Sequence, residues 1–392
     1  MKLLIAIPAY NEEEAIEKII VRSLEARDYI KANSPVTEVD VTVVSDGSVD
    51  GTAAIAGRYA DRIRLIAYQP NRGYGAAIKT GWAGSDADLL GFLDADGTCD
   101  PKFFAPLCAR LERDKADVIL GCRLNPGSKM PLIRRIGNTI FALILSAFSS
   151  ARVRDTASGM RVIRRASLPK LMPLPDGLHF TPAMSARAML AKGVKICEID
   201  MPYHEREGES KLRVGKDGLR FLRVILETAF LYRPPRPLWL LAAMCLAAAA
   251  GLMIMPAAYY LQNRSVVEWM IYRFVVSHLA GTSALLFFCA GQLGGRVVGL
   301  TLEDGAGRGK LGAFFTWRYF WLVPLALMAA GGWLVMPSLV ELIRTGSTYE
   351  HWSRFIAMSF LFSAAVILIV TAALNYFLDL VGAQLAYVRG QS

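Results

Sequence analysis

Four long apolar segments in the second half of the chain constrain its fold more than any other feature. They cover residues 238–261, 274–294, 319–340 and 355–381. Each is long enough to cross a bilayer as a helix, because a span needs about 20 mostly apolar residues. Gly, Ala and Ser recur within them, as close packing of helices in lipid requires. The sequence therefore predicts an all-α membrane domain of four transmembrane helices over residues 238–392.

The composition fits a membrane protein. Of the 392 residues, 54% are hydrophobic and 20% are charged, whereas charged residues make up about 25% of ordinary soluble domains. The net charge is +10, from 44 Lys and Arg against 34 Asp and Glu. Beside apolar spans, this excess favours attraction to an anionic membrane surface over attraction to nucleic acid. We therefore expect the membrane as a partner and no nucleic acid.

The basic residues that flank the spans orient them. Flanks and loops on one side carry Arg220, Arg223, Arg233, Arg236, Arg296, Arg308, Lys310, Arg318 and Arg389. The two loops on the other side carry Arg264, Arg273, Arg344 and Arg354. Because the side richer in Lys and Arg stays in the cytosol, both termini are predicted to be cytosolic.

Neither the cysteines nor the N-terminus indicate a secreted protein. The six cysteines form no Cys-x-x-Cys pair and no Cys/His cluster, so we expect neither a zinc site nor a disulfide framework. The apolar run at residues 3–7 stops at Pro8, and it is shorter than the run of about seven residues that a signal peptide needs. The first domain is therefore expected to stay on the side of the membrane where it is synthesised.

Residues 1–212 alternate short apolar runs with helical patterns. The runs lie at residues 3–7, 39–45, 63–67, 89–94 and 118–122, and helical patterns cover segments such as 13–26 and 53–60. This alternation is typical of an α/β domain with a mostly parallel sheet. Ligands bind such sheets at the carboxyl ends of the strands, which is where this sequence places its acidic and glycine-rich turns.

Two segments have the pattern of helices that lie on a membrane. In residues 213–237, basic residues recur every three to four positions beside a leucine-rich stripe, ahead of a Pro-rich hinge. This predicts a basic amphipathic juxtamembrane helix, although the same periodicity fits a surface helix of the first domain. Residues 132–149 contain an apolar run that is too short to span a bilayer, which predicts an interfacial helix or, alternatively, a core helix.

A pair of carboxylates ends the fourth apolar run. Residues 93–97 read Leu-Asp-Ala-Asp-Gly, and in an extended chain Asp94 and Asp96 point to the same side. Two such carboxylates can share Mg²⁺ or Mn²⁺ together with substrate phosphates. The cation would neutralise the charge on a departing nucleoside diphosphate. The simpler alternative is an ordinary turn at the end of a strand.

Further motifs follow the other predicted strands. They read Ile-Pro-Ala-Tyr-Asn-Glu at 7–12, Ser-Asp-Gly-Ser-Val-Asp-Gly-Thr at 45–52 and Asn-Arg-Gly-Tyr-Gly-Ala-Ala-Ile-Lys at 71–79. In this order, and together with the acidic pair, they resemble family 2 glycosyltransferases of the GT-A fold over roughly residues 3–212. The resemblance implies a nucleotide-sugar-binding domain that acts as a glycosyltransferase.

The resemblance also implies roles for individual residues. The donor nucleotide-sugar would be bound by Pro8, Tyr10, Asn11, Glu12, Asp46, Lys79, Ala95 and Arg123, with Arg123 on the diphosphate side. Simpler alternatives exist for three of them. Asn11 and Glu14 fit a helix capping box, Asp46 fits an ordinary turn before Gly47, and Lys79 fits a surface lysine.

Two later motifs narrow the resemblance to the polyprenyl-phosphate hexosyltransferases. They read Arg-Asp-Thr-Ala-Ser-Gly-Met-Arg at 154–161 and His-Glu-Arg-Glu-Gly-Glu-Ser-Lys-Leu at 204–212. Arg206, Ser210 and Lys211 precede the basic amphipathic helix and would bind the acceptor's lipid phosphate, unless they form a solvated loop. The resemblance implies an integral protein of the bacterial inner (plasma) membrane, with its catalytic domain in the cytosol.

The implied reaction is inverting hexose transfer from a UDP- or GDP-sugar to undecaprenyl or dolichyl phosphate. A phosphate monoester with a second pKa of about 6 arrives as an oxyanion and needs no general base. Asp155 is the candidate for contacting sugar hydroxyls or assisting the reaction. Thr98 replaces the Gln that some relatives place near the metal, which leaves the third metal ligand open.

Other functions remain open at this point. A related enzyme could act on a lipid hydroxyl or a polysaccharide, although the Gln-x-x-Arg-Trp string of processive synthases is missing. A non-enzymatic scaffold or a flippase-like partner is the other alternative. The sequence does not identify the sugar or the nucleotide, and it leaves homo-oligomerisation open.

Overall fold

The computed structural model describes residues 1–149, 151–204, 214–302, 309–347 and 351–390, except for the side chains of Val214 and Arg389. The chain divides into two compact units, Met1–Ala229 and Phe230–Ser392. This boundary falls near the end of helix α8, Val214–Tyr232. Most of α8 therefore packs with the first unit, and each unit is described separately below.

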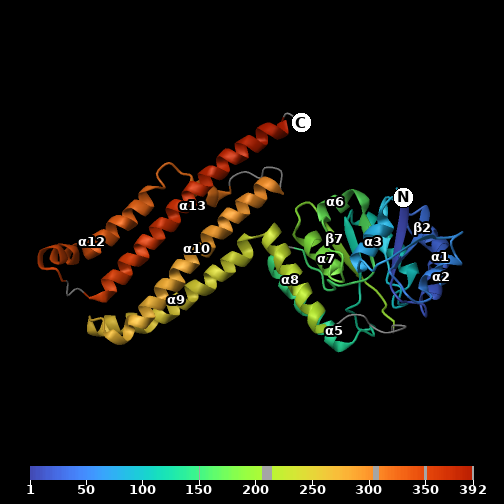
Figure 1. Cartoon of the computed structure of the whole chain (residues 1–392), viewed down its shortest axis with the longest axis horizontal. Helices are drawn as coiled ribbons and strands as arrows, with labels where there is room; N and C mark the ends of the chain where they lie inside the picture. The colour runs from blue at the N-terminus through green and yellow to red at the C-terminus, as the bar shows by residue number, and fades with distance from the viewer. Residues whose placement is uncertain (150, 205–213, 303–308, 348–350, 391–392) are drawn as a thin grey trace. The chain divides into compact units, whose positions relative to one another are not determined.

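The first unit is an α/β domain built on a seven-stranded sheet (Figure 1). The strands are β1 Lys2–Ala9, β2 Glu38–Asp46, β3 Arg64–Tyr68, β4 Leu89–Phe92, β5 Val118–Cys122, β6 Arg161–Arg164 and β7 Ile196–Asp200. Their order is β3-β2-β1-β4-β6-β5-β7. β6 runs antiparallel to both of its neighbours, whereas the other pairings are parallel. This confirms the predicted mostly parallel sheet.

Helices connect and cover these strands. They are α1 Ile16–Asn33, α2 Thr52–Gly57, α3 Tyr74–Trp82, α4 Phe104–Arg113, α5 Leu132–Phe148, α6 Leu168–Leu171, α7 Phe180–Leu190 and α8, with short 3₁₀ turns at Pro101–Phe103 and Arg165–Ser167. Successive side chains of β1 point to opposite faces of the sheet. Leu3, Ile5 and Ile7 pack in the core with α1. Ala6 faces α3, where a Cβ on Gly81 would lie 2.9 Å from the Ala6 Cβ.

An aromatic cluster joins α3 to the end of β4. The rings of Trp82, Phe92 and Phe180 lie 5.9–6.0 Å apart between centroids. Tyr74, the first residue of α3, packs edge-on against Phe92 at 6.4 Å and Phe180 at 6.5 Å. Such offset and edge-on contacts fix ring orientation. They hold the start of α3 beside the turn that follows β4.

The second unit contains the four predicted apolar helices. Its helices are α9 Pro235–Asn263, α10 Ile271–Thr301, α11 Lys310–Phe315, α12 Leu322–Thr345 and α13 Trp352–Gly390, with a 3₁₀ turn at Glu268–Met270. Four of them, α9, α10, α12 and α13, are long and apolar enough to cross a membrane. The expected Pro-rich hinge lies in and next to the first turn of α9, a position that tolerates proline.

Small residues and one polar network pack these helices. A Cβ on Gly291 of α10 would lie 2.8 Å from the Trp239 ring, and one on Gly331 of α12 would lie 2.9 Å from the Phe362 ring. This is the close packing expected in lipid. Between α10 and α13, Asn375 exchanges hydrogen bonds with Gln292, and Arg296 bonds both Asn375 and Asp379. These buried polar groups therefore satisfy one another, as an apolar environment demands.

Candidate active site

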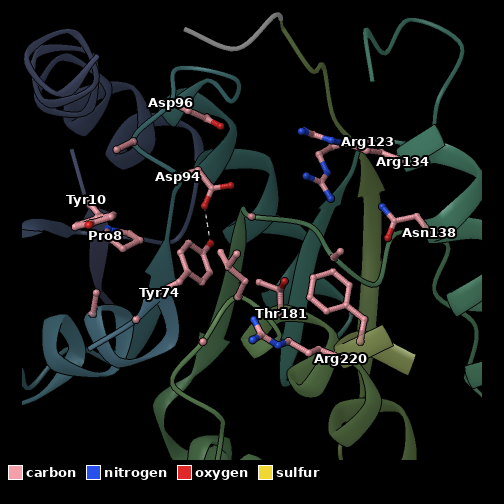
Figure 2. Close-up of a pocket in the computed structure, with 18 of the residues that line it drawn as sticks. Pro8, Tyr10, Tyr74, Asp94, Asp96, Arg123, Arg134, Asn138, Thr181 and Arg220 are labelled. Atoms are coloured by element: carbon pink, nitrogen blue, oxygen red, sulfur yellow. Dashed lines mark hydrogen bonds between the residues drawn. The ribbon is translucent and has the colours of Figure 1, made fainter. Parts of the chain in front are cut away.

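A cavity of about 540 Å³ lies at the carboxyl ends of the strands of the first unit (Figure 2). Its lining comes from the ends of β1 and β2, from the turns after β3, β4 and β5, and from α3, α5, α7 and α8. The volume falls within the range of about 300–1,000 Å³ that is usual for small-molecule sites. The sequence predicts a ligand site at this edge of the sheet, and a cavity lies there.

One side of the cavity is formed by the predicted nucleotide-binding residues. Pro8, Tyr10, Glu12 and Asp46 all line it. The Asp46 carboxylate also accepts the backbone N–H groups of Arg72 and Gly73, at 2.7 and 2.8 Å. It therefore shapes the turn after β3 while it faces the cavity.

Asn11 has a different position from its neighbours. It does not appear among the cavity-lining residues of the described chain. Its side-chain oxygen accepts the N–H of Val49 at 2.9 Å, and its backbone φ is +50°. The capping-box alternative is wrong, because α1 begins at Ile16 and its N-cap, Ala15, makes no side-chain cap. Asn11 instead ties the turn after β1 to the turn after β2.

The glycine-rich turn packs against the chain's own backbone. Gly73 has φ +104°, and a Cβ on Gly75 would lie 2.2 Å from the carbonyl oxygen of Pro175. The Lys79 side chain contacts the same neighbouring segment. Its Nζ lies 2.6 Å from Asp176 Oδ1 and 2.7 Å from the Leu174 carbonyl oxygen. Lys79 is therefore engaged with residues 174–176 and, within the described residues, does not line the cavity.

Asp94, Ala95 and Asp96 line the cavity from the turn after β4. β4 ends at Phe92, and residues 95–97 form a turn in which Gly97 has φ +73°. The predicted extended conformation of residues 94–96 is therefore wrong. A turn, rather than the alternation of a strand, brings both carboxylates to the cavity.

Each carboxylate accepts a hydrogen bond from a hydroxyl. Tyr74 donates to Asp94 Oδ1 at 2.5 Å, and Thr98 donates to Asp96 Oδ1 through Oγ1 at 2.6 Å and through its backbone N–H at 3.1 Å. Burial, and then the nearby Asp94, raise the pKa of Tyr74 well above its ordinary value. The tyrosine hydroxyl therefore keeps its proton and donates.

The acidic pair fits a divalent cation that is shared with substrate. Carboxylate oxygens are the ligands that Mg²⁺ and Mn²⁺ prefer, and Mg²⁺ is often held by one or two carboxylates plus substrate phosphates. Asp94 Oδ2 has room because residue 159 is glycine, where a Cβ would lie 1.9 Å from that oxygen. Among the described residues, no group of three or more His, Cys, Asp or Glu could hold a metal by itself. Substrate phosphate oxygens and water are the other ligands that such a cation usually takes.

Arg123 and Asp155 form a buried ion pair behind the opposite side of the cavity. Arg123 Nε and Nη2 lie 2.7 and 2.9 Å from the two carboxylate oxygens, and the Arg123 backbone N–H donates at 3.0 Å. Asn138 Nδ2 donates to the same carboxylate at 3.0 Å. Burial alone would raise the pKa of Asp155, but the charge and hydrogen bonds of Arg123 outweigh burial and lower it.

This arrangement gives Asp155 a different place from the one expected. Its side chain is fully buried and, in the described part of the chain, it is not among the residues that line the cavity. Arg123 and Asn138 do line it. Asp155 therefore positions these two side chains at the cavity surface.

The cavity has an acidic wall and a basic wall. Figure 2 shows Asp94 and Asp96 on the same side as Tyr10 and Pro8, Arg123, Arg134 and Asn138 across from them, and Arg220 at the bottom of the view. Arg134 and Asn138 stand four residues apart on α5, which places them on one helix face. This spacing was readable in the sequence, whereas the contribution of Tyr74 and Thr181 to the cavity depends on tertiary packing.

Comparison with known proteins decides the family. The profile described as Glycosyl transferase family 2 matches residues 4–172. A dolichyl-phosphate hexose transferase of Haloferax volcanii is 33% identical over 216 residues, which cover 54% of this chain and 86% of that protein. The chain belongs to glycosyltransferase family 2.

Other similar proteins are more distant or only partly covered. The low-salt glycan biosynthesis hexosyltransferase Agl6 of Haloferax volcanii is 31% identical over 240 residues, and the match spans 59% of this chain but only 55% of Agl6. The structure of glucosyl-3-phosphoglycerate synthase from Mycobacterium tuberculosis with Mn²⁺, UDP and glucosyl-3-phosphoglycerate is 18% identical. It covers 58% of this chain and 80% of that chain, with a TM-score of 0.43.

One predicted part of this glycosyltransferase lies outside the described residues. Arg206, Ser210 and Lys211, which the sequence assigns to the acceptor phosphate, all fall in residues 205–213, which the structure does not describe. The described chain resumes at α8, from which Gly218, Arg220 and Phe221 reach the cavity.

Substitution of Gly159 tests the acidic wall of this glycosyltransferase. In Gly159→Ala, the new Cβ would overlap Asp94 Oδ2 and displace the carboxylate. We expect a loss of about a hundredfold in transfer rate, the scale of removing one key electrostatic stabiliser. The matched control is Gly57→Ala in α2, where a Cβ would lie 3.9 Å from the Leu65 side chain. Equal initial rates for both variants would contradict the assigned role of Asp94.

Proposed function

We propose that this glycosyltransferase moves a hexose from a UDP- or GDP-sugar to the phosphate of a polyprenyl lipid, undecaprenyl or dolichyl phosphate. The observation that carries the proposal is the pairing of an acidic and a basic wall across one cavity. The acidic wall suits a cation with the donor diphosphate, and the arginines of the basic wall suit a second anionic group. The dolichyl-phosphate hexose transferase of Haloferax volcanii, at 33% identity, supports the same choice of acceptor.

The proposed reaction needs positioning and charge stabilisation rather than a general base. An oxygen of the acceptor phosphate attacks the anomeric carbon, the bond from that carbon to the diphosphate breaks, and its electron pair leaves with the nucleoside diphosphate. A Mg²⁺ or Mn²⁺ ion held by Asp94 and Asp96 would neutralise charge on the leaving group. In-line attack inverts the anomeric centre. Arg123, fixed by Asp155, stabilises the anionic groups that meet in the cavity.

Helix α5 supports a lipid acceptor. The cavity-facing residues Arg134 and Asn138 belong to this helix. The same helix exposes an aliphatic stripe at three- to four-residue spacing, consisting of Leu132, Ile136, Ile140 and Leu143. An exposed apolar stripe beside basic residues is typical of helices that lie in the membrane interface. We propose that α5 rests there and presents its polar face to the phosphate of a lipid.

The transfer reaction itself is the decisive test. Membranes that contain the full chain would be incubated with labelled UDP- or GDP-sugars and a polyprenyl phosphate, and the lipids would be extracted. We expect a labelled polyprenyl-phosphate sugar whose formation stops when divalent cations are chelated. Labelling of a free polyprenol would instead indicate a lipid-hydroxyl acceptor, and no labelled lipid with any donor would reject the proposal.

Arg134 tests the acceptor side of the cavity. Arg134→Met keeps much of the aliphatic stem but removes the charge, so the lipid-phosphate concentration for half-maximal rate should rise about ten- to a hundredfold, the scale of one charged hydrogen bond. Arg135→Met is the matched control, because Arg135 is adjacent on α5 but absent from the cavity lining of the described chain. Nucleotide affinity, measured by titration, should change much less. A variant that loses nucleotide affinity but keeps its lipid dependence would move Arg134 to the donor side.

Labelling of introduced cysteines tests the proposed orientation, in which the first unit is cytosolic in the plasma membrane of a bacterial cell. Ser347→Cys, between α12 and α13, should react with an impermeant maleimide in intact cells. Lys310→Cys, at the start of α11, should react only after permeabilisation. The native protein is the control, because its six cysteines are buried or half-buried. The reverse pattern of labelling would overturn the orientation.

A further inference from the structure

We propose that Tyr74 and Thr98 are positioning residues that preset Asp94 and Asp96 for a divalent cation and its nucleotide. This inference rests on the proposed function only in assigning the cation and the diphosphate to the acidic pair. Neither hydroxyl needs to touch the donor sugar or the lipid. Each acts through the carboxylate that it holds.

The Tyr74 hydroxyl is held in a fixed place. It belongs to the first residue of α3, and its ring is clamped edge-on by Phe92 and Phe180. From this ring the hydroxyl reaches Asp94 Oδ1 at 2.5 Å, as the dashed line in Figure 2 marks. On its other side, the Asp94 carboxylate lies against Gly159. The carboxylate is therefore confined between a hydroxyl and a backbone.

Thr98 holds the Asp96 carboxylate in place from within the turn after β4. Thr98 is buried, and it donates to Asp96 Oδ1 from its hydroxyl at 2.6 Å and from its backbone N–H at 3.1 Å. The turn is anchored on both sides, since the Thr98 carbonyl accepts the N–H of His204 at 3.0 Å and the Gly97 carbonyl accepts Arg22 at 3.3 Å. Asp96 is therefore fixed by a short residue that cannot itself reach across the cavity.

The two hydroxyls leave the carboxylates able to bind a cation. An ionised carboxylate has about four lone-pair sites on its two oxygens, so it can accept a hydroxyl hydrogen bond and also coordinate a cation. Holding both groups in one orientation before binding removes the cost of ordering them when the cation arrives. A hydrogen bond that orients a ligand typically contributes about ten- to a hundredfold in metal affinity. We therefore expect the two hydroxyls to make cation binding by Asp94 and Asp96 tighter.

Three variants and one control test this inference by a measurement that does not depend on turnover. Binding of Mn²⁺ to the full chain in detergent would be followed by calorimetry, in the presence of UDP and, separately, of GDP. Tyr74→Phe and Thr98→Val should each weaken Mn²⁺ binding about tenfold, whereas Thr98→Ser, which keeps the hydroxyl, should restore native affinity. Tyr59→Phe is the matched control, because it also removes a tyrosine–carboxylate hydrogen bond, to Glu17 at 2.9 Å, but lies outside the cavity lining.

The outcomes separate this inference from the proposed function. Unchanged Mn²⁺ affinity in Tyr74→Phe and Thr98→Val would overturn it. Tighter binding in Tyr74→Phe would also overturn it, since the tyrosine would then compete with the cation. If the variants weaken Mn²⁺ binding as expected but no lipid is glycosylated, the positioning role stands and the proposed acceptor fails. If lipid is glycosylated and both variants keep native metal affinity and metal requirement, the positioning role alone fails.

Discussion

The ion pair between Arg123 and Asp155 is the interaction on which the rest of the cavity depends. Its carboxylate has no exposed surface, and it ties together the end of β5, the loop before β6 and, through Asn138, helix α5. Removing one partner of a buried pair typically costs about 3–5 kcal/mol, because the other charge is left unpaired. Folding lowers the pKa of Asp155. The pair therefore stabilises the fold above the ordinary carboxyl pKa of about 3.9 and loses this contribution as the pH falls.

The separation of charge across the cavity answers a problem that two anionic substrates would create. A nucleoside diphosphate and a lipid phosphate repel each other, most strongly where water is excluded. Placing carboxylates on one wall and arginines on the other lets each anion meet positive charge of a different origin, a cation on one side and guanidinium groups on the other. Under the proposed function, the protein therefore supplies geometry and compensating charge, and the acceptor supplies the nucleophile.

Much of the fold could be predicted from local patterns, but the geometry of the site could not. The five apolar runs correspond to β1 to β5, whereas β6 and β7 were not among the predicted strands. Each of the four apolar segments lies in or overlaps a long helix. The residue types predict Asp94 and Asp96 as site residues, and both line the cavity, yet a turn rather than an extended strand presents them. Asn11 was open to a capping interpretation because the pattern cannot show that its side chain bonds Val49, 38 residues away. Tyr74 lies in the motif at residues 71–79, but the sequence assigns it no role, since its contact with Asp94 depends on packing against Phe92 and Phe180.

The geometry of α5 connects the chemistry of the cavity to the proposed lipid substrate. A helix rises about 1.5 Å per residue, so Arg134 and Asn138 lie about one turn apart and on the same helix as the exposed aliphatic stripe. If that stripe sits in the membrane interface, the basic wall stands within one helix diameter, roughly 10 Å, of the lipid surface. A polyprenyl phosphate could then place its head group in the cavity while its chain stays in the bilayer. The transfer would not require the lipid to leave the membrane, and the large cost of exposing its apolar chain to water would be avoided.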